Sequence, residues 1–168
     1  MIFRVGAAVL FTVIGGVIGY SLADRLREAR NICVSIGQIF RSAEYIICRR
    51  GDDVYSFCRS LKEEKQFSCL GFVNFLPDEY KSGEDFHKLW RDAVESGFYG
   101  NKEEKELLIR FGEILGRADC SAQLSEIYDL ERELEAIMVL RRDALLKKGR
   151  LYRGTGLLFG VMAGILVL

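Results

Sequence analysis

The side chains that could do chemistry in this 168-residue chain do not form a recognisable catalytic set. The single histidine, His87, has no second histidine and no cysteine pair nearby with which to share a metal ion. The chain has no phosphate-cradling glycine motif and no H-E-x-x-H motif. Glu44 and Asp119 could approach each other at one end of a helical bundle, but two carboxylates placed only by sequence are weak support for acid–base catalysis. We therefore predict a protein that is not an enzyme and binds no cofactor and no metal; a membrane-tethered enzyme is the less favoured alternative.

The cysteines also favour a structural interpretation. There are five, an odd number without a C-x-x-C pair, so a disulfide framework is not expected. We interpret them as small buried hydrophobic residues in a reducing compartment: Cys33, Cys48, Cys58, Cys69 and Cys120. His87 is expected at the surface or its boundary. Trp90 and the phenylalanines occur at helical spacing, which favours core packing over a ligand platform.

The distribution of charge defines two terminal segments. The 24 basic and 24 acidic residues balance, and we expect no nucleic-acid partner. No charge occurs from Val5 to Ala23 or from Gly154 to Leu168. The first run would make about 28 Å of helix, close to the thickness of a bilayer core, and the shorter second run could instead be a buried helix. Its glycines are spaced as on close-packing membrane helices. We predict transmembrane helices over 3–23 and 154–168.

Both terminal runs carry their basic flanks on the side that faces the middle of the chain. Arg25, Arg27 and Arg30 follow the first run, and a lysine- and arginine-rich stretch over 141–153 precedes the second. The positive-inside rule then places residues 24–153 in the cytoplasm and both termini across the membrane. A cleaved signal peptide is less favoured, because the apolar stretch is too long and the basic residues follow it at once.

The middle segment reads as helical almost throughout, which makes the expected fold all-α. An apolar seam at alternating intervals of four and three predicts a long helix that packs lengthwise against another, as in a coiled coil, and it consists of Leu22, Leu26, Ala29, Cys33, Ile36, Phe40, Ala43 and Ile47. Shorter helices follow, with Asp53, Asp85 and the pair Asn101 and Glu104 as expected N-terminal caps. A second long helix begins after Asp119. Residues 24–153 are therefore predicted to form an antiparallel helical bundle.

The stretch "FGEILGRADCSAQ", residues 111–123, would join the last two helices of this bundle. A glycine inside a helix costs about 1 kcal/mol relative to alanine, so two glycines here need an explanation. We interpret Gly116 as the residue that ends one helix, Asp119 as the N-cap of the next, and Gly112 as a place of close helix approach. A corner that binds no partner is the favoured interpretation, and a partner-binding tip is the alternative.

The sequence resembles the stage III sporulation protein AB family, membrane proteins of endospore-forming bacteria. The resemblance covers the whole chain and lies in "GYSLADRLREAR", "LIRFGEILGRADCSAQ", "LERE" and "LYRGTGLLFGVMAGILVL". Its most specific element is the F-G-x-x-L-G-x-x-D-x-x-x-Q pattern of the corner. The segment "YIICRRGDDVYS", residues 45–56, departs from the family by lacking a proline in the first loop.

The resemblance implies a non-enzymatic platform in a secretion-like complex, similar to the inner-membrane platform proteins of type II secretion. It would link a cytoplasmic ATPase to a channel in the mother-cell membrane facing the forespore. A regulatory adaptor outside sporulation is the alternative, and self-association into a homo-oligomer stays open. The candidate partner-binding residues are Phe111, Gly112, Leu115, Gly116, Asp119, Gln123, Glu126 and Asp129. A solvated helix face is the simpler explanation of the acidic residues among them.

Overall fold

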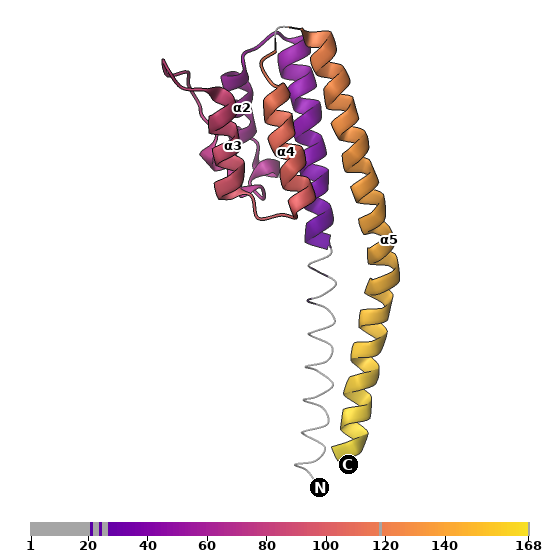
Figure 1. Ribbon diagram of the computed structural model, residues 1–168. Helices are drawn as coiled ribbons and strands as arrows, with labels where there is room; N and C mark the ends of the chain where they lie inside the picture. The colour runs from indigo at the N-terminus through magenta and orange to yellow at the C-terminus, as the bar shows by residue number, and fades with distance from the viewer. Residues whose placement is uncertain (1–20, 22–23, 25–26, 118, 168) are drawn as a thin grey trace. The chain divides into compact units, whose positions relative to one another are not determined.

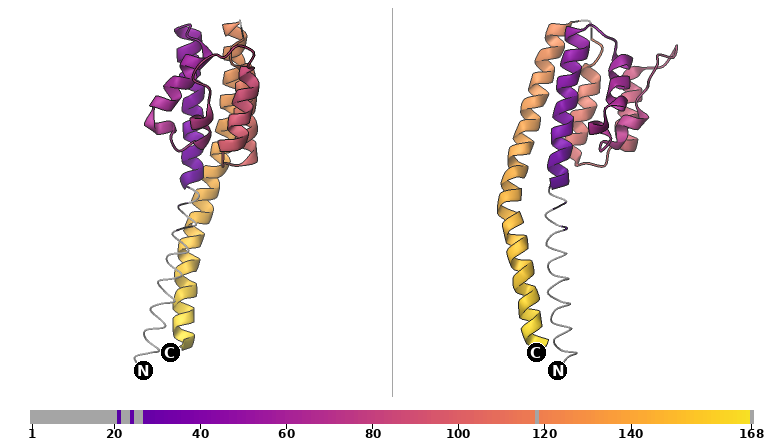
Figure 2. Two further views of the ribbon diagram at one scale, coloured as in Figure 1. Left: turned by 90° about the vertical axis from the view of Figure 1, so that its left-hand side faces the viewer. Right: turned by 180° about the vertical axis from the view of Figure 1, so that it is seen from behind.

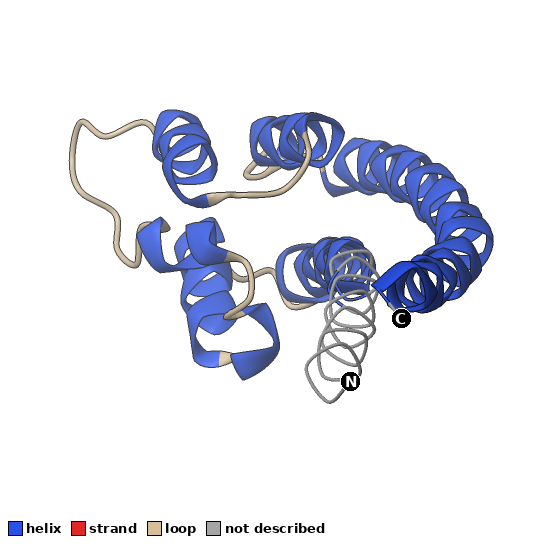
Figure 3. Ribbon diagram, turned by 90° about the horizontal axis from the view of Figure 1, so that it is seen from below, coloured by secondary structure: helices blue, strands red, loops and turns tan. Residues whose placement is uncertain are grey.

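The computed structural model describes the backbone of residues 21, 24, 27–117 and 119–167, and the side chains of these residues except Cys48 and 144–167. All the regular structure in this part of the chain is helical, without a strand, which confirms the predicted all-α class (Figure 3). The chain divides into a main unit, Asn31–Ile137, and a terminal unit, Met1–Arg30 with Met138–Leu168. The predicted domain boundaries at residues 24 and 153 stay predictions.

The first long helix runs over residues 27–43 and widens into a π-helix, η1 (Glu44–Arg49). Within the main unit the predicted seam is confirmed, because Cys33, Ile36, Phe40, Ala43 and Ile47 are all buried. The wider turn shows in the hydrogen bond from the Arg50 amide to the Tyr45 carbonyl, 3.1 Å long and five residues back. Gly51 follows at φ +73°, a left-handed conformation in which the chain turns away, so the helix ends where the sequence predicted.

Three short elements follow this turn. Helix α2 (Val54–Glu63) begins at the predicted cap, where the Asp53 carboxylate accepts from the Ser56 amide at 2.6 Å. The 3₁₀ turns η2 (Lys65–Phe67) and η3 (Gly71–Phe75) then bury large apolar side chains in a segment with no long helical period. A loop over 76–85 leads to the next helix.

The remaining helices are α3 (Phe86–Gly97), α4 (Lys102–Ile114) and α5 (Cys120–Val167). Their predicted caps are confirmed: Asp85 accepts from the His87 amide at 3.0 Å, and Asn101 forms a capping box with Glu104. In the main unit the first helix lies beside α4 and the first part of α5, α3 packs beside α4, and α2 lies on the side of the first helix (Figures 2 and 3). An ion pair between Arg41 and Glu131, 3.5 Å long, joins the first helix to α5.

The core of the main unit is an aromatic cluster centred on Trp90, which is fully buried. Its ring lies 5.6 Å from that of Phe111, 5.7 Å from Phe72 and 6.5 Å from Phe57, measured between centroids. These residues come from α2, η3, α3 and α4, so one cluster connects elements that are far apart in the sequence. The prediction that Trp90 belongs to the core is confirmed.

The interpretation of the cysteines is only partly right. Cys33 and Cys58 are buried, and burial raises the pKa of the Cys58 thiol to about 12. Cys69 and Cys120 are exposed, so for these two the prediction was wrong. Cys69 lies in the turn after η2 and Cys120 is the first residue of α5, and both places leave a side chain on the surface. None of these four thiols forms a disulfide within the described part of the chain.

In the terminal unit, α5 continues as helix to Val167, and Arg141 Nη1 donates to the Ala29 carbonyl at 3.2 Å. Within the described residues no helix is both long and apolar enough to cross a membrane. The predicted N-terminal span over 3–23 lies almost wholly outside the described residues. The two terminal spans therefore stay predictions.

Candidate functional site

Gly112 explains how α3 approaches α4 so closely. A Cβ atom built on Gly112 would lie 2.1 Å from Trp90 Cδ1 and 2.6 Å from Trp90 Nε1. Nonbonded heavy atoms normally keep a distance of about 3.5 Å or more, so only glycine leaves room for the indole. The prediction that Gly112 serves a close approach is confirmed. The group that it admits is a tryptophan ring, which the sequence did not indicate.

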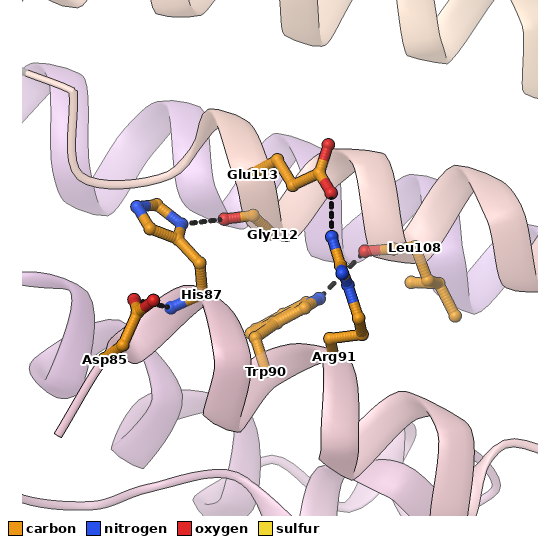
Figure 4. Close-up of polar contacts among 7 residues, drawn as sticks. All are labelled: Asp85, His87, Trp90, Arg91, Leu108, Gly112 and Glu113. Atoms are coloured by element: carbon orange, nitrogen blue, oxygen red, sulfur yellow. Dashed lines mark hydrogen bonds and ion pairs between the residues drawn. The ribbon is translucent and has the colours of Figure 1, made fainter.

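Polar contacts hold α3 against α4 around this point (Figure 4). Trp90 Nε1 donates to the Leu108 carbonyl at 2.8 Å, which satisfies the only polar atom of the buried indole. His87 Nδ1 lies 2.8 Å from the Gly112 carbonyl oxygen and must donate, since a carbonyl can only accept. Arg91 forms an ion pair with Glu113 one turn along α3. His87 is exposed, as predicted, and its ring fixes the last turn of α4 from outside.

The corner between α4 and α5 has the geometry that the sequence predicted. Helix α4 ends at Ile114, and Gly116 takes the left-handed conformation at φ +79°. The Asp119 carboxylate accepts from the amides of Ser121 (2.9 Å) and Ala122 (3.3 Å) and from the Ser121 hydroxyl (2.8 Å). These hydrogen bonds, above all the one from the Ser121 hydroxyl, hold the pKa of Asp119 below its ordinary value. The N-cap at Asp119 is therefore confirmed.

Gln123 lies in the interior. It is 0% exposed, and within the described structure neither its side-chain nitrogen nor its oxygen has a hydrogen-bond partner. A buried polar group without a partner costs about 1–3 kcal/mol, so replacing this amide by an apolar side chain is expected to raise stability. Gln123 is a candidate partner-binding residue only under the alternative interpretation of the corner, and its side chain does not reach the surface in this structure.

The charged surface of the corner is a groove between α4 and α5. It encloses about 290 Å³ and is lined by Arg110, Glu113, Ile114, Arg117, Glu126, Asp129 and Leu130. Two ion pairs lie there: Arg110 of α4 pairs with Glu133 of α5 at 2.9 Å, and Arg117 of the turn pairs with Glu126 of α5. Asp129 is exposed and forms no ion pair with any described residue.

The structure divides the eight candidate residues into two sets. Phe111, Gly112, Leu115 and Gln123 are buried and build the corner, whereas Gly116, Asp119, Glu126 and Asp129 reach its surface. A partner-binding role is untested for all of them. Sequence reasoning missed Arg110 and Glu113 of α4 and Arg117 of the turn that follows it. The spacing of three residues between Arg110 and Glu113 was the signal that these two share one face of α4.

The fold and the site define an all-helical protein with a braced inter-helix corner. Among the described residues, no three histidine, cysteine, aspartate or glutamate side chains gather as a metal site would require. The chain belongs to the stage III sporulation protein AB family, whose sequence model matches residues 4–168. The protein thus has a sporulation-related role, and the family is not a known enzyme family. No curated protein and no solved structure matches the chain significantly.

Proposed function

We propose that this protein is a non-enzymatic membrane platform of a sporulation-specific secretion-like complex. Its main unit would link a cytoplasmic ATPase to a channel between mother cell and forespore. Membership of the sporulation family supports the setting, and the family resemblance supports the ATPase as partner. The membrane location follows from the charge-free terminal runs and their basic flanks.

The observation that best supports the platform role is the charged groove between α4 and α5. One ion pair joins α4 to α5, a second joins the turn between them to α5, and the aromatic cluster packs against α4 through Phe111. Residues presented on such a rigid scaffold bind a partner without a large ordering cost. Asp129 lines this groove with an exposed carboxylate that no described cation neutralises. The groove is thus suited to a partner surface that carries a basic side chain.

A further acidic residue on α5 also favours a partner with a basic surface. Glu135 is exposed on the helix that carries Asp129, whereas Glu133 is paired with Arg110 across the groove. Exposed charges at the rim of an interface act mainly on the rate of association, and salt screens them. We therefore expect electrostatics to govern how quickly the partner arrives.

A charge reversal at Asp129 tests the platform role. Asp129→Lys should slow association of the full chain with the cytoplasmic ATPase about threefold or more at low salt, and the difference should shrink as salt is added. Glu95→Lys changes the net charge equally at an exposed position on α3 and serves as the matched control. Stopped-flow fluorescence measures the rate. Equal association rates for Asp129→Lys and the unmodified chain at low salt would refute docking at this groove.

The membrane topology is tested separately. A cysteine added after Leu168 should react with a membrane-impermeant maleimide in intact cells, because we place that end across the membrane. Cys69 and Cys120 are exposed on the main unit, so they should react only after the cells are permeabilised. Labelling of these native thiols in intact cells would reverse the proposed orientation.

A further inference from the structure

A hollow beside the loop before α3 is a second surface feature of the main unit. It encloses about 450 Å³ and is lined by Phe75, Leu76, Pro77, Asp78, Glu79, Lys81, Glu84 and Leu89. The volume lies within the range of about 300–1,000 Å³ that is typical of ligand-binding pockets. The loop over 76–85 projects at the same end of the main unit as the corner between α4 and α5 (Figures 1 and 2).

Contacts with α2 fix the base of the loop. Lys62 Nζ lies 2.7 Å from the Asp78 carboxylate, and Arg59 Nη2 donates to the Asp78 backbone carbonyl at 3.2 Å. The ring of Tyr80 packs edge-on against that of Tyr55, with 5.9 Å between centroids. These contacts anchor the loop to α2 at Asp78, which lines the hollow, and at Tyr80 beside it.

Phe75 provides an exposed aromatic surface at the edge of this hollow. It is 62% exposed, yet its ring lies 2.7 Å from the position that a Cβ on Gly97 would occupy. The absence of a side chain at Gly97 thus lets one side of the ring rest on the last turn of α3 while the other faces outward. Aromatic side chains held in this way are enriched at the centres of protein–protein interfaces.

The polar groups of the hollow favour a cation. Three acids and one lysine line it, and Lys62 already neutralises Asp78. Glu79 and Glu84 are exposed and form no ion pair with any described residue. The floor is apolar, because Leu76 is buried and Pro77 and Leu89 are partly so. An arginine or lysine side chain matches this arrangement, with its aliphatic stem on the floor and its charged head at the two glutamates.

We propose that the hollow binds a basic segment of a partner protein, one that places an arginine or lysine next to an apolar residue. The charged side chain enters the hollow, and the apolar neighbour packs against Phe75. This surface is distinct from the groove between α4 and α5, and its occupation does not depend on the identity of the ATPase. The protein would then hold two partner segments at one end of its main unit.

The test uses the full chain and a fluorescein-labelled peptide of alternating arginine and leucine, with binding followed by fluorescence anisotropy. Glu79→Gln together with Glu84→Gln should raise the Kd about fivefold, the effect of losing two exposed ion pairs. Phe75→Ala should raise it about tenfold, as expected for a central aromatic contact. The matched control, Glu95→Gln with Glu135→Gln, removes the same charge at exposed positions outside the hollow and should bind as the unmodified chain does.

Thermal unfolding of each variant separates a binding defect from a folding defect, because the glutamate substitutions lie on the surface and should leave the unfolding temperature unchanged. Equal Kd values for the Glu79 and Glu84 double variant and the unmodified chain would overturn the proposal. So would an equal loss of binding in the control, which would show general attraction to acidic surface. Free arginine amide binding as tightly as the peptide would assign the hollow to a small cation and not to a protein segment.

Discussion

Replacing Gly112 with alanine should destabilise the protein, although alanine is the better helix former. The added Cβ would stand 2.1 Å from Trp90 Cδ1 and 2.5 Å from Trp90 Cγ, so the ring or the helix must move. The ring has no free space to move into, because it is fully buried among the side chains of Phe57, Phe72, Phe86 and Phe111.

Three contributions set the size of the effect. Overpacking a filled core costs about 1–3 kcal/mol. A displaced indole also loses its 2.8 Å hydrogen bond to the Leu108 carbonyl, which is worth about 1 kcal/mol. Against these stands a gain of about 1 kcal/mol from replacing glycine by alanine within a helix. The net prediction for Gly112→Ala is a loss of about 2 kcal/mol in the free energy of unfolding.

The protein contains its own reporter for this experiment. Trp90 is the only tryptophan, so intrinsic fluorescence during denaturant unfolding of the full chain follows the affected ring directly. Gly37→Ala is the matched control, since Gly37 also lies in a helix but its added Cβ would be 3.5 Å from Leu134 Cδ2, an ordinary contact. We expect that control to be stabilised by about 1 kcal/mol through helix propensity.

A double substitution tests the cause. Because Gly112→Ala clashes with the indole itself, combining it with Trp90→Phe should cost less than the sum of the two single changes. Circular dichroism replaces fluorescence for the variants that lack the tryptophan. The reasoning is refuted if Gly112→Ala is as stable as the Gly37→Ala control and its tryptophan emission is unchanged.

Four further expectations follow from the corner and the thiols. Gly116→Ala should lower the free energy of unfolding by about 1 kcal/mol because the residue is left-handed, whereas Gly116→Asn should be tolerated better; equal losses in thermal unfolding would argue against this. Gln123→Met should raise stability by about 1 kcal/mol by removing a buried amide without partners, and a loss in urea unfolding would show that the amide is satisfied. The depressed pKa of Asp119 means that its cap stabilises the fold above the ordinary aspartate pKa and that this contribution disappears as pH falls through the lowered value; thermal unfolding of Asp119→Asn should lack this acid-side loss, and parallel pH profiles would contradict it. A chain that retains only Cys69 should react rapidly with Ellman's reagent at neutral pH, whereas one that retains only Cys58 should react only on unfolding, and fast reaction of the latter would disprove its burial.

The caps and turns of this protein could be predicted from sequence because they depend on a few neighbouring residues. Gly51 and Gly116 occupy left-handed positions that favour glycine, and Asp53 and Asp119 accept from amides no more than three residues away. The apolar seam of the first helix could also be predicted, because the 3.6-residue period of an α-helix places Cys33, Ile36 and Phe40 on one side.

Features that depend on distant parts of the chain could not be predicted from the sequence. The widening of the first helix into η1 has no local sequence signal that we recognised. Cys69 and Cys120 are exposed because the elements packed around them do not cover these two side chains. Nothing near Gln123 in sequence indicated that its amide would be buried without a hydrogen-bond partner among the described residues.

The candidate sites show the same division. The sequence by itself determined the family, the all-helical class and the position of the corner, because these are encoded in periodicity and in a local motif. Only the tertiary structure decided that Gly112 makes room for Trp90, and that acidic residues of α5 share a groove with Arg110 of α4 and Arg117 of the turn. It also decided that the loop before α3 encloses a hollow. Each of these needs side chains from separate elements to meet in space, and single-sequence periodicity specifies which face of a helix is buried but not which neighbour covers it.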